Sequence, residues 1–110
     1  VSAFMNFNMA TSQAPESVDM AGMVFTLASC SDIPATGNEA SFIMTTRWRR
    51  INDVLTVDPA SFIYQNTTDA GILIDYVEDA NQLRLEVTGI AGVNLNWSGY
   101  SLTTYERIFV

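Results

Sequence analysis

The residues of this chain that could do chemistry are carboxylates. Asp75, Glu78 and Asp79 lie close together, and Asp69 stands shortly before them. Two carboxylates can act as the acid and base of glycoside hydrolysis, and a cluster of them can bind calcium. Alternatively, they belong to a turn, where Asp is favoured and its charge stays solvated. We favour the turn, because the sequence lacks the D-x-D-x-D-G spacing of a calcium loop and a second cluster of ligands.

Other catalytic groups are missing from the sequence. The 110 residues contain no histidine and no lysine. This excludes Ser-His-Asp and Cys-His arrangements, Schiff-base chemistry and a Walker-type phosphate loop. The single cysteine, Cys30, permits no internal disulfide and no cysteine-based zinc site, and it is expected to be a small buried hydrophobe. We therefore expect a protein that is not an enzyme, with no catalytic residue, no cofactor and no metal.

The charge balance also limits the partners. Twelve acidic residues against five basic ones give a net charge of −7, which opposes binding to a phosphate backbone. No apolar run is long enough to span a membrane. We expect neither nucleic acid binding nor membrane insertion. The charged fraction of 15% is low for a globular domain. It fits a surface that is partly buried against other subunits.

The hydrophobic periodicity is that of β-strands. Leu83, Leu85 and Val87 alternate with polar residues, which gives their strand one apolar and one polar face. Turn-forming residues separate the apolar segments, as at Asn52-Asp53 and 78–82. We expect about eight strands, near 2–9, 22–29, 40–51, 54–57, 61–65, 71–77, 82–88 and 93–108. Short strands at this spacing predict an all-β fold, a single antiparallel β-sandwich or jelly roll domain over residues 1–110.

Strand parity predicts the core and the surfaces that contact partners. Trp48 shares its parity with Phe42 and Met44, so it is either core or the anchor of an interface. Both ends of the chain are apolar, which suggests pairing with a sheet or a partner. The expected core is Met5, Phe7, Phe25, Leu27, Phe42, Ile74, Leu83, Leu85, Val87, Leu95 and Trp97. The expected interface residues are Met5, Phe7, Arg47, Trp48, Arg49, Tyr105 and Phe109.

The C-terminal part of the chain resembles a known family. The strand ending in Val87-Thr88-Gly89 turns through Ala91-Gly92 into a strand with Trp97, followed by a strand with Glu106. This order is similar to the C-terminal β-domains of bacteriophage tail fibres and tail appendages. The segment from Ala40-Ser41-Phe42 to Asn52-Asp53 looks like the long central hairpin of that family.

The resemblance implies a structural protein of the phage virion. As a tail-fibre module the chain would form a homotrimer, contact other virion proteins and present loops to a host surface glycan. A capsid decoration protein, which staples the subunits of the head, is the alternative that the short single domain favours. A monomeric carbohydrate-binding module is a third possibility, but it needs an exposed aromatic platform, which the parity of Trp48 and Trp97 does not predict.

Overall fold

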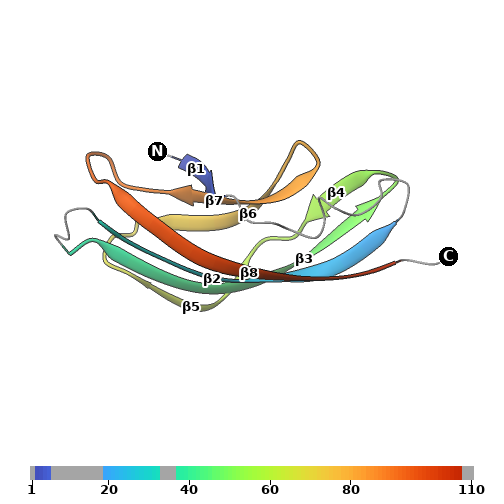
Figure 1. Ribbon diagram of the computed structural model, residues 1–110, viewed down its shortest axis with the longest axis horizontal. Helices are drawn as coiled ribbons and strands as arrows, with labels where there is room; N and C mark the ends of the chain where they lie inside the picture. Colours follow the sequence, from blue (N-terminus) through green and yellow to red (C-terminus); the bar gives the residue numbers. More distant parts are fainter. Residues whose placement is uncertain (1, 6–18, 33–36, 108–110) are drawn as a thin grey trace.

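The computed structural model describes residues 2–5, 19–32 and 37–107, with the backbone alone for residues 2–5 and 107. Eight strands make up most of this part of the chain (Figure 1). They are β1 (Ser2–Met5), β2 (Met20–Asp32), β3 (Glu39–Ile51), β4 (Val54–Val57), β5 (Ser61–Thr67), β6 (Leu73–Asp79), β7 (Gln82–Thr88) and β8 (Leu95–Arg107).

The strands form two antiparallel sheets that face each other. The smaller sheet has the order β1-β7-β6, and the larger has the order β4-β3-β2-β8. Strand β5 also pairs with β3, on the same edge as β4, because β2 occupies the other edge of β3. The larger sheet curves around the smaller one, so its outer surface is convex (Figure 1). The predicted β-sandwich is therefore confirmed.

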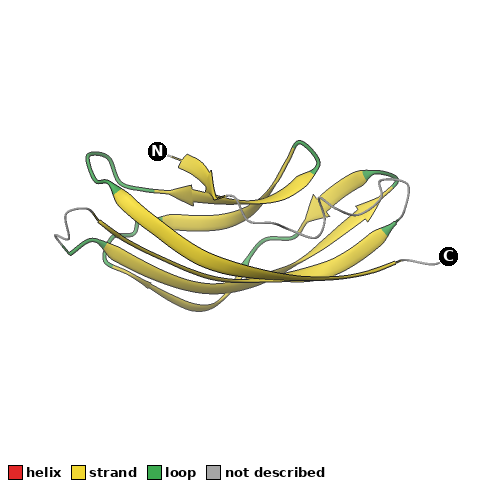
Figure 2. Ribbon diagram, in the orientation of Figure 1, coloured by secondary structure: helices red, strands yellow, loops and turns green. Residues whose placement is uncertain are grey.

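The described residues form strands, turns and loops and include no helix (Figure 2). No helix in this part of the chain is long and apolar enough to cross a membrane. The strand boundaries follow the prediction closely. Strands β4 and β7 have the expected limits, and β2 is longer at both ends.

Two tight turns fall where the sequence predicts them. Asn52 and Asp53 have φ of 50° and 63°, and Ala80 and Asn81 have φ of 51° and 61°. Two consecutive positive φ angles are typical of the two-residue turn whose twist matches that of a β-hairpin. Asn and Asp adopt this conformation more readily than other residues with a side chain. These turns connect β3 to β4 and β6 to β7.

The two turns are also tied to each other through Asn81. Its side-chain Nδ2 donates a hydrogen bond to the Asp53 carbonyl at 2.8 Å, and its Oδ1 accepts one from the Leu55 amide at 2.9 Å. Asn81 belongs to the hairpin of the smaller sheet, whereas Asp53 and Leu55 belong to the larger one. The contact therefore closes the sandwich along the side where β4 lies next to β6 and β7.

The core lies between the sheets and is built from residues of alternating parity. In β7 the side chains of Leu83, Leu85 and Val87 are buried, while Arg84 and Glu86 remain partly exposed, which confirms the predicted register. Phe42 and Ile74 are also buried as expected. The buried cluster comprises Met20, Val24, Ala28, Cys30, Ala40, Phe42, Met44, Trp48, Leu55, Ile72, Ile74, Tyr76, Leu83, Leu85 and Val87.

The predicted face of β2 is wrong by one residue. Val24, Thr26 and Ala28 point into the core, whereas Leu27 is 42% exposed and Phe25 is only half-buried. Both faces of this strand carry apolar side chains, and the prediction assigned the larger ones to the core. Leu95 and Trp97 are partly buried and pack against the core. Of the remaining predicted core residues, Met5 has only its backbone described, and Phe7 lies outside the described residues.

A series of hydrogen bonds between hydroxyl groups links the two sheets inside the sandwich. The Tyr76 hydroxyl lies 2.7 Å from Thr26 Oγ1 and 3.1 Å from the Met44 carbonyl oxygen, and Thr26 Oγ1 lies 2.8 Å from Ser101 Oγ. Tyr76 comes from β6, and its two partners, Thr26 and Met44, come from β2 and β3. Ser101, the other partner of Thr26, comes from β8. The pKa of Tyr76 is raised to about 12, mainly by burial; the Thr26 hydrogen bond lowers it, and the nearby Asp75 charge raises it.

This pKa predicts a loss of stability at alkaline pH. The folded state holds the Tyr76 proton up to about pH 12, whereas the unfolded chain releases it near pH 10. The contribution to stability is complete below about pH 10 and is lost as the pH rises through about 12. Between these values the free energy of unfolding should fall by up to about 3 kcal/mol, since one pKa unit corresponds to about 1.4 kcal/mol.

Urea denaturation at pH 8, 10 and 11.5 measures this effect. The variant Tyr76→Phe should be less stable than the wild type at pH 8, because it loses a buried hydrogen bond worth about 1 kcal/mol. Its stability should then fall less steeply with pH. The matched control is Tyr100→Phe, which removes a hydroxyl from an exposed tyrosine and should leave the pH dependence unchanged. Parallel pH profiles for wild type and Tyr76→Phe would contradict the prediction.

Candidate functional site

The outer face of the larger sheet carries a continuous set of apolar side chains. In β2 these are Met23, Phe25 and Leu27, which point away from the core. The register places Leu102 of β8 beside Phe25 and Tyr100 beside Leu27. On the other side of β2, Ile43 lies next to Leu27, and Tyr64 of β5 lies next to Ile43. We call this set the apolar belt: Met23, Phe25, Leu27, Ile43, Tyr64, Tyr100 and Leu102.

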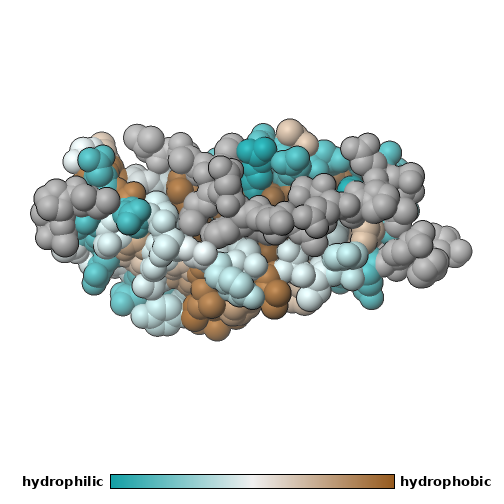
Figure 3. Space-filling model, in the orientation of Figure 1, coloured by the Kyte–Doolittle hydropathy of each residue, from teal (hydrophilic) through white to brown (hydrophobic). Residues whose placement is uncertain are grey.

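The belt is well exposed. Met23, Tyr100 and Leu102 are each more than half exposed, and Tyr64 is 48% exposed. Figure 3 shows hydrophobic side chains gathered at the middle of the convex side, in the region where Figure 1 places β2, β3, β5 and β8. Soluble monomers rarely expose a large contiguous apolar surface, so a surface of this kind indicates a site that binds a partner or a ligand. Single exposed hydrophobic residues would need no such explanation.

Polar residues border the belt at both ends. Towards one end, Ser29 pairs with Ser41 of β3 and Ser98 of β8, and the next row contains Glu39 and Asn96. A shallow depression of about 350 Å³ lies where the belt meets this serine row. It is lined on the apolar side by Leu27, Ile43, Tyr64 and Tyr100, and on the polar side by Ser29, Ser41 and Ser98.

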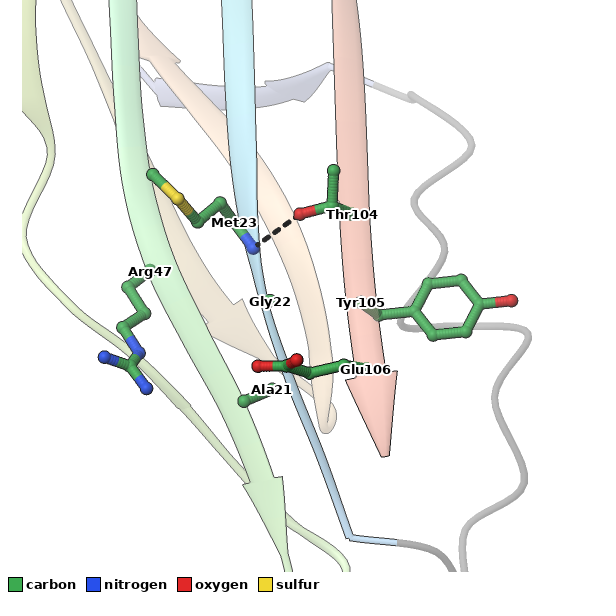
Figure 4. A pocket seen from close by; sticks show the side chains of 7 residues that line it. All are labelled: Ala21, Gly22, Met23, Arg47, Thr104, Tyr105 and Glu106. Carbon is green, nitrogen blue, oxygen red and sulfur yellow. Dashed lines mark hydrogen bonds between the residues drawn. The ribbon is translucent and has the colours of Figure 1, made fainter. Parts of the chain in front are cut away.

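A second depression, of about 420 Å³, lies at the opposite end of the belt (Figure 4). Arg47 of β3 and Glu106 of β8 stand on either side of β2, whose residues Ala21, Gly22 and Met23 form the floor. The Met23 amide donates a hydrogen bond to Thr104 Oγ1 at 3.3 Å. The ring of Tyr105 extends away from β2, beyond β8, and is 57% exposed.

The predicted interface residues fall into three groups. Arg47 and Tyr105 are exposed, and Arg49 is partly exposed and forms an ion pair of 3.6 Å with Asp58. The backbone of Met5 pairs with that of Leu85. Phe7 and Phe109 lie outside the described residues. Arg47 adjoins the belt beside Met23, whereas Tyr105 has the strand parity opposite to that of the belt residues Tyr100 and Leu102. The structure does not bring all seven residues together.

Trp48 is a core residue. Its side chain is 1% exposed, so its own chain already buries the surface that an interface anchor would offer. The register places Trp48 beside Gly22, whose missing side chain leaves room for the indole ring. The Trp48 Nε1 atom has no hydrogen-bond partner among the described residues. Trp97 stacks on Phe42 with 6.3 Å between ring centroids, and it is partly buried too.

The carboxylates near residues 69–79 make the local contacts of turns and strand ends. Asp69 Oδ1 accepts a hydrogen bond from the Gly71 amide at 2.7 Å, and Glu78 Oε1 accepts one from the Asn81 amide at 3.0 Å. Asp79 lies 3.5 Å from the Arg84 guanidinium. The described part of the chain contains no group of three or more His, Cys, Asp or Glu side chains that could hold a metal ion.

Cys30 matches its predicted environment. It is unpaired and 5% exposed in the core. Burial raises the pKa of its thiol, and a backbone hydrogen bond with Ala40 only partly opposes this effect. Because the thiolate is the reactive form of cysteine, this environment disfavours nucleophilic chemistry at Cys30.

Comparison of the chain with known proteins found no matching family model, no matching curated protein and no matching solved structure.

Strand parity contains a signal for part of the belt that the sequence analysis did not use. If Leu95 and Trp97 point towards the core, then Ser98, Tyr100, Leu102 and Thr104 must point outwards. Tyr100 and Leu102 could therefore have been recognised as exposed hydrophobic residues. Leu27 and Tyr64 could not, because only the pairing of β2 with β3 and of β3 with β5 brings them to either side of Ile43.

The floor of the depression in Figure 4 predicts the effect of a substitution at Gly22. A Cβ atom at this position would overlap the Thr104 carbonyl oxygen and lie 2.9 Å from Trp48 Cζ2. The variant Gly22→Ala should therefore be destabilised by about 2–4 kcal/mol, as expected for an overpacked site that displaces backbone. Gly37→Ala meets no atom within 4 Å and serves as the control for overpacking, although its φ of 103° adds local strain.

Thermal and urea denaturation followed by circular dichroism measure this difference. A Gly22→Ala variant as stable as the wild type would contradict the close packing of β2 against β8 and Trp48 at this end of the sheet.

Proposed function

We propose that this chain is a structural subunit of a bacteriophage virion that works by burying its apolar belt against other protein subunits. The belt is the observation that supports the binding role. The assignment to a virion rests on the resemblance of Val87-Thr88-Gly89, Ala91-Gly92 and Trp97 to tail-fibre β-domains. On this proposal the protein is not an enzyme, and its partners are copies of itself and other virion proteins.

The make-up of the belt fits a protein interface. Its centre contains aromatic, aliphatic and methionine side chains and no charged residue, while Arg47, Glu39 and the serine row lie at its border. Interface cores are depleted in charged residues and enriched in aromatic residues and Met, and polar residues form the rim. Burial of the belt would be favourable by about 25 cal/mol for each Å² of apolar surface removed from water.

Two positions in the virion are compatible with this surface. As a tail-fibre module, the role that the resemblance implies, the chain would associate with identical chains and present its loops to a receptor. As a capsid decoration protein, it would lay the belt on the head lattice. The convex shape of the larger sheet favours a partner with a concave groove, because two convex surfaces touch only over a small area (Figure 1).

Substitutions in the belt test the proposal. The double variant Leu27→Ser with Tyr100→Ser removes two exposed side chains from the centre of the belt. It should weaken association of the chain by about tenfold or more, since burial of one large apolar side chain contributes about 1.5–3 kcal/mol. Its unfolding free energy should change by less than about 1 kcal/mol. Sedimentation velocity from 1 to 200 µM, a range set for the experiment on the order of typical interface affinities, measures association.

The matched control is Leu73→Ser, because Leu73 is a 50% exposed residue on the outer face of the other sheet. It should leave association unchanged. A wild-type chain that remains monomeric across this range, and that does not bind particles lacking it, would overturn the proposed function.

One observation favours glycan binding as a second candidate function. Tyr64 and Tyr100 line the same depression of about 350 Å³, together with Ser29, Ser41 and Ser98. Aromatic rings can stack on sugar rings, and serine hydroxyls can exchange hydrogen bonds with sugar hydroxyls. The platform is therefore formed by tyrosines, while the tryptophans considered from the sequence are buried or partly buried.

Binding of neutral oligosaccharides to the monomer, measured by calorimetry, tests this candidate. Tyr64→Ala and Tyr100→Ala should each weaken such binding by about tenfold, as expected for the loss of one stacking contact. Tyr105→Ala is the matched control, because Tyr105 is exposed but lies outside this depression. Equal binding by all three variants would exclude the depression as the glycan site.

A further inference from the structure

Two opposite charges lie at one end of the belt, on either side of β2. Arg47 of β3 is next to Met23, and Glu106 of β8 is next to Ala21. Both charged side chains are exposed and line the depression in Figure 4. Neither forms an ion pair with another residue in the part of the chain that the structure describes. A positive and a negative group are therefore available to a partner that covers the belt.

The side chains of the outer face form rows that run across the strands. In each row β2 lies in the middle, with β3 on one side and β8 on the other. From the charged end, and from β3 through β2 to β8, four successive rows are Arg47-Met23-Thr104, Thr45-Phe25-Leu102, Ile43-Leu27-Tyr100 and Ser41-Ser29-Ser98. Because β3 and β8 are both direct neighbours of β2, a twofold axis parallel to β2 exchanges them within every row.

We propose that two copies of this chain associate face to face through their belts, about a twofold axis that runs parallel to β2. This inference rests on the proposed function, because it names one partner of the belt and the orientation in which that partner binds. Strand β2 of each copy would lie over β2 of the other, and β3 would lie over β8. Sheets that pack with nearly aligned strands lie about 10 Å apart, and their facing side chains interdigitate.

The apolar residues match in this orientation. Ile43 of one copy would contact Tyr100 of the second copy. Met23, Phe25 and Leu27 would each meet the same residue of the second copy across the axis. Large apolar side chains would therefore meet large apolar side chains along the centre of the contact, whose burial supplies the affinity. At the polar end of the belt, the serine row would face the serine row.

The charges match as well. Arg47 would lie over Thr104 of the second copy, one row from Glu106 of that copy, within reach of a long arginine side chain. The axis creates this neighbourhood twice. At the other end of the same face, Glu39 would lie over Asn96 of the second copy. No like charges would oppose each other, and such opposition would suppress association.

The opposite orientation of the two copies satisfies fewer groups. A twofold axis across the strands would place Arg47 over Ser41 of the second copy, and Glu106 over its Asn96. Both unpaired charges would then face neutral groups. Met23 would face Ser29, so part of the belt would also be covered by polar residues. Charge and apolar matching together therefore favour the axis parallel to β2.

The curvature of the larger sheet limits the contact to the belt. Figures 1 and 3 place the hydrophobic side chains at the middle of the convex side. Two convex faces touch at their middle, so the belt is the part that meets first, while the rows at both ends stay closer to water. Contacts of small area are typical of weak and transient association. We therefore expect a dimer that dissociates in the micromolar range.

The variant Glu106→Arg tests the orientation and separates it from general repulsion. It replaces one negative charge by a positive one, so the net charge of the chain changes from −7 to −5 and overall repulsion falls. In the proposed dimer, however, the new arginine would lie near Arg47 of the second copy. The dissociation constant should therefore rise by about tenfold. Sedimentation equilibrium of the full chain at about 50 mM salt, where charges are weakly screened, measures the constant.

The matched control is Glu39→Arg. It makes the same change in net charge on the same face of the larger sheet, but Glu39 is at the other end and would face a neutral side chain. This variant should dimerise at least as tightly as the wild type. Both variants should unfold at the same urea concentration as the wild type, since the two glutamates are exposed.

A mixing experiment tests the reciprocal contact. The variant Arg47→Glu should dimerise weakly by itself, because its glutamate would lie near Glu106 of the second copy. An equimolar mixture of Arg47→Glu with Glu106→Arg should form heterodimers about tenfold more tightly than either variant associates alone. In the mixed dimer, both glutamates of one chain would lie near both arginines of the other. High salt should reduce these differences.

Several outcomes would overturn the inference. One is equal dimerisation by Glu106→Arg and Glu39→Arg, and another is a mixture that associates no better than its components. A trimer in place of a dimer is a third. Association that Leu27→Ser with Tyr100→Ser abolishes and the charge variants leave unchanged would overturn this orientation but leave the proposed function standing. The same holds for a monomer that binds particles lacking it. A wild-type chain that associates with neither would overturn both.

Discussion

The structure depends on the pairing of β2 along both of its edges. β3 lies on one side of this strand and β8 on the other, and both are paired over nearly its whole length. The pairing makes β2 the centre of the larger sheet. Because side chains alternate along a strand, it also divides the apolar residues of β2 between two tasks. Val24 and Ala28 contribute to the core, while Met23 and Leu27 contribute to the outer belt.

A second contact fixes the two sheets relative to each other. Thr26 lies on the core side of β2, between the belt residues Phe25 and Leu27. Its hydroxyl group connects Tyr76 of the smaller sheet with Ser101 of β8. A buried hydroxyl group without a hydrogen-bond partner destabilises the folded state. These hydrogen bonds therefore favour one position of the two sheets relative to each other over positions shifted by one residue. The sheet that carries the belt is therefore held in place by these hydrogen bonds as well as by packing of the core.

Much of the fold could be predicted from sequence, because most strands have one clearly apolar face. The alternation of Leu83, Leu85 and Val87 and the turn at Asn52-Asp53 are local signals, and both predictions are confirmed. The prediction of the buried face of β2 was wrong because the two faces of this strand are similarly apolar, and side-chain size does not decide which face is buried. The belt was missed for another reason. It draws on four strands, and only the pairing of distant segments brings Tyr64 and Tyr100 close to Leu27.

The distribution of charge favours association through the larger sheet. On the outer face of the smaller sheet, Asp75 lies directly opposite Glu86 in the register, and like charges in this position are unfavourable. Asp79 and Glu78 lie at the end of the same hairpin. The centre of the belt has no charge. With a net charge of −7, two copies repel each other at most orientations, and least where the uncharged belt faces the partner. The acidic composition thus disfavours contact through the smaller sheet and leaves the larger sheet as the surface on which association costs least.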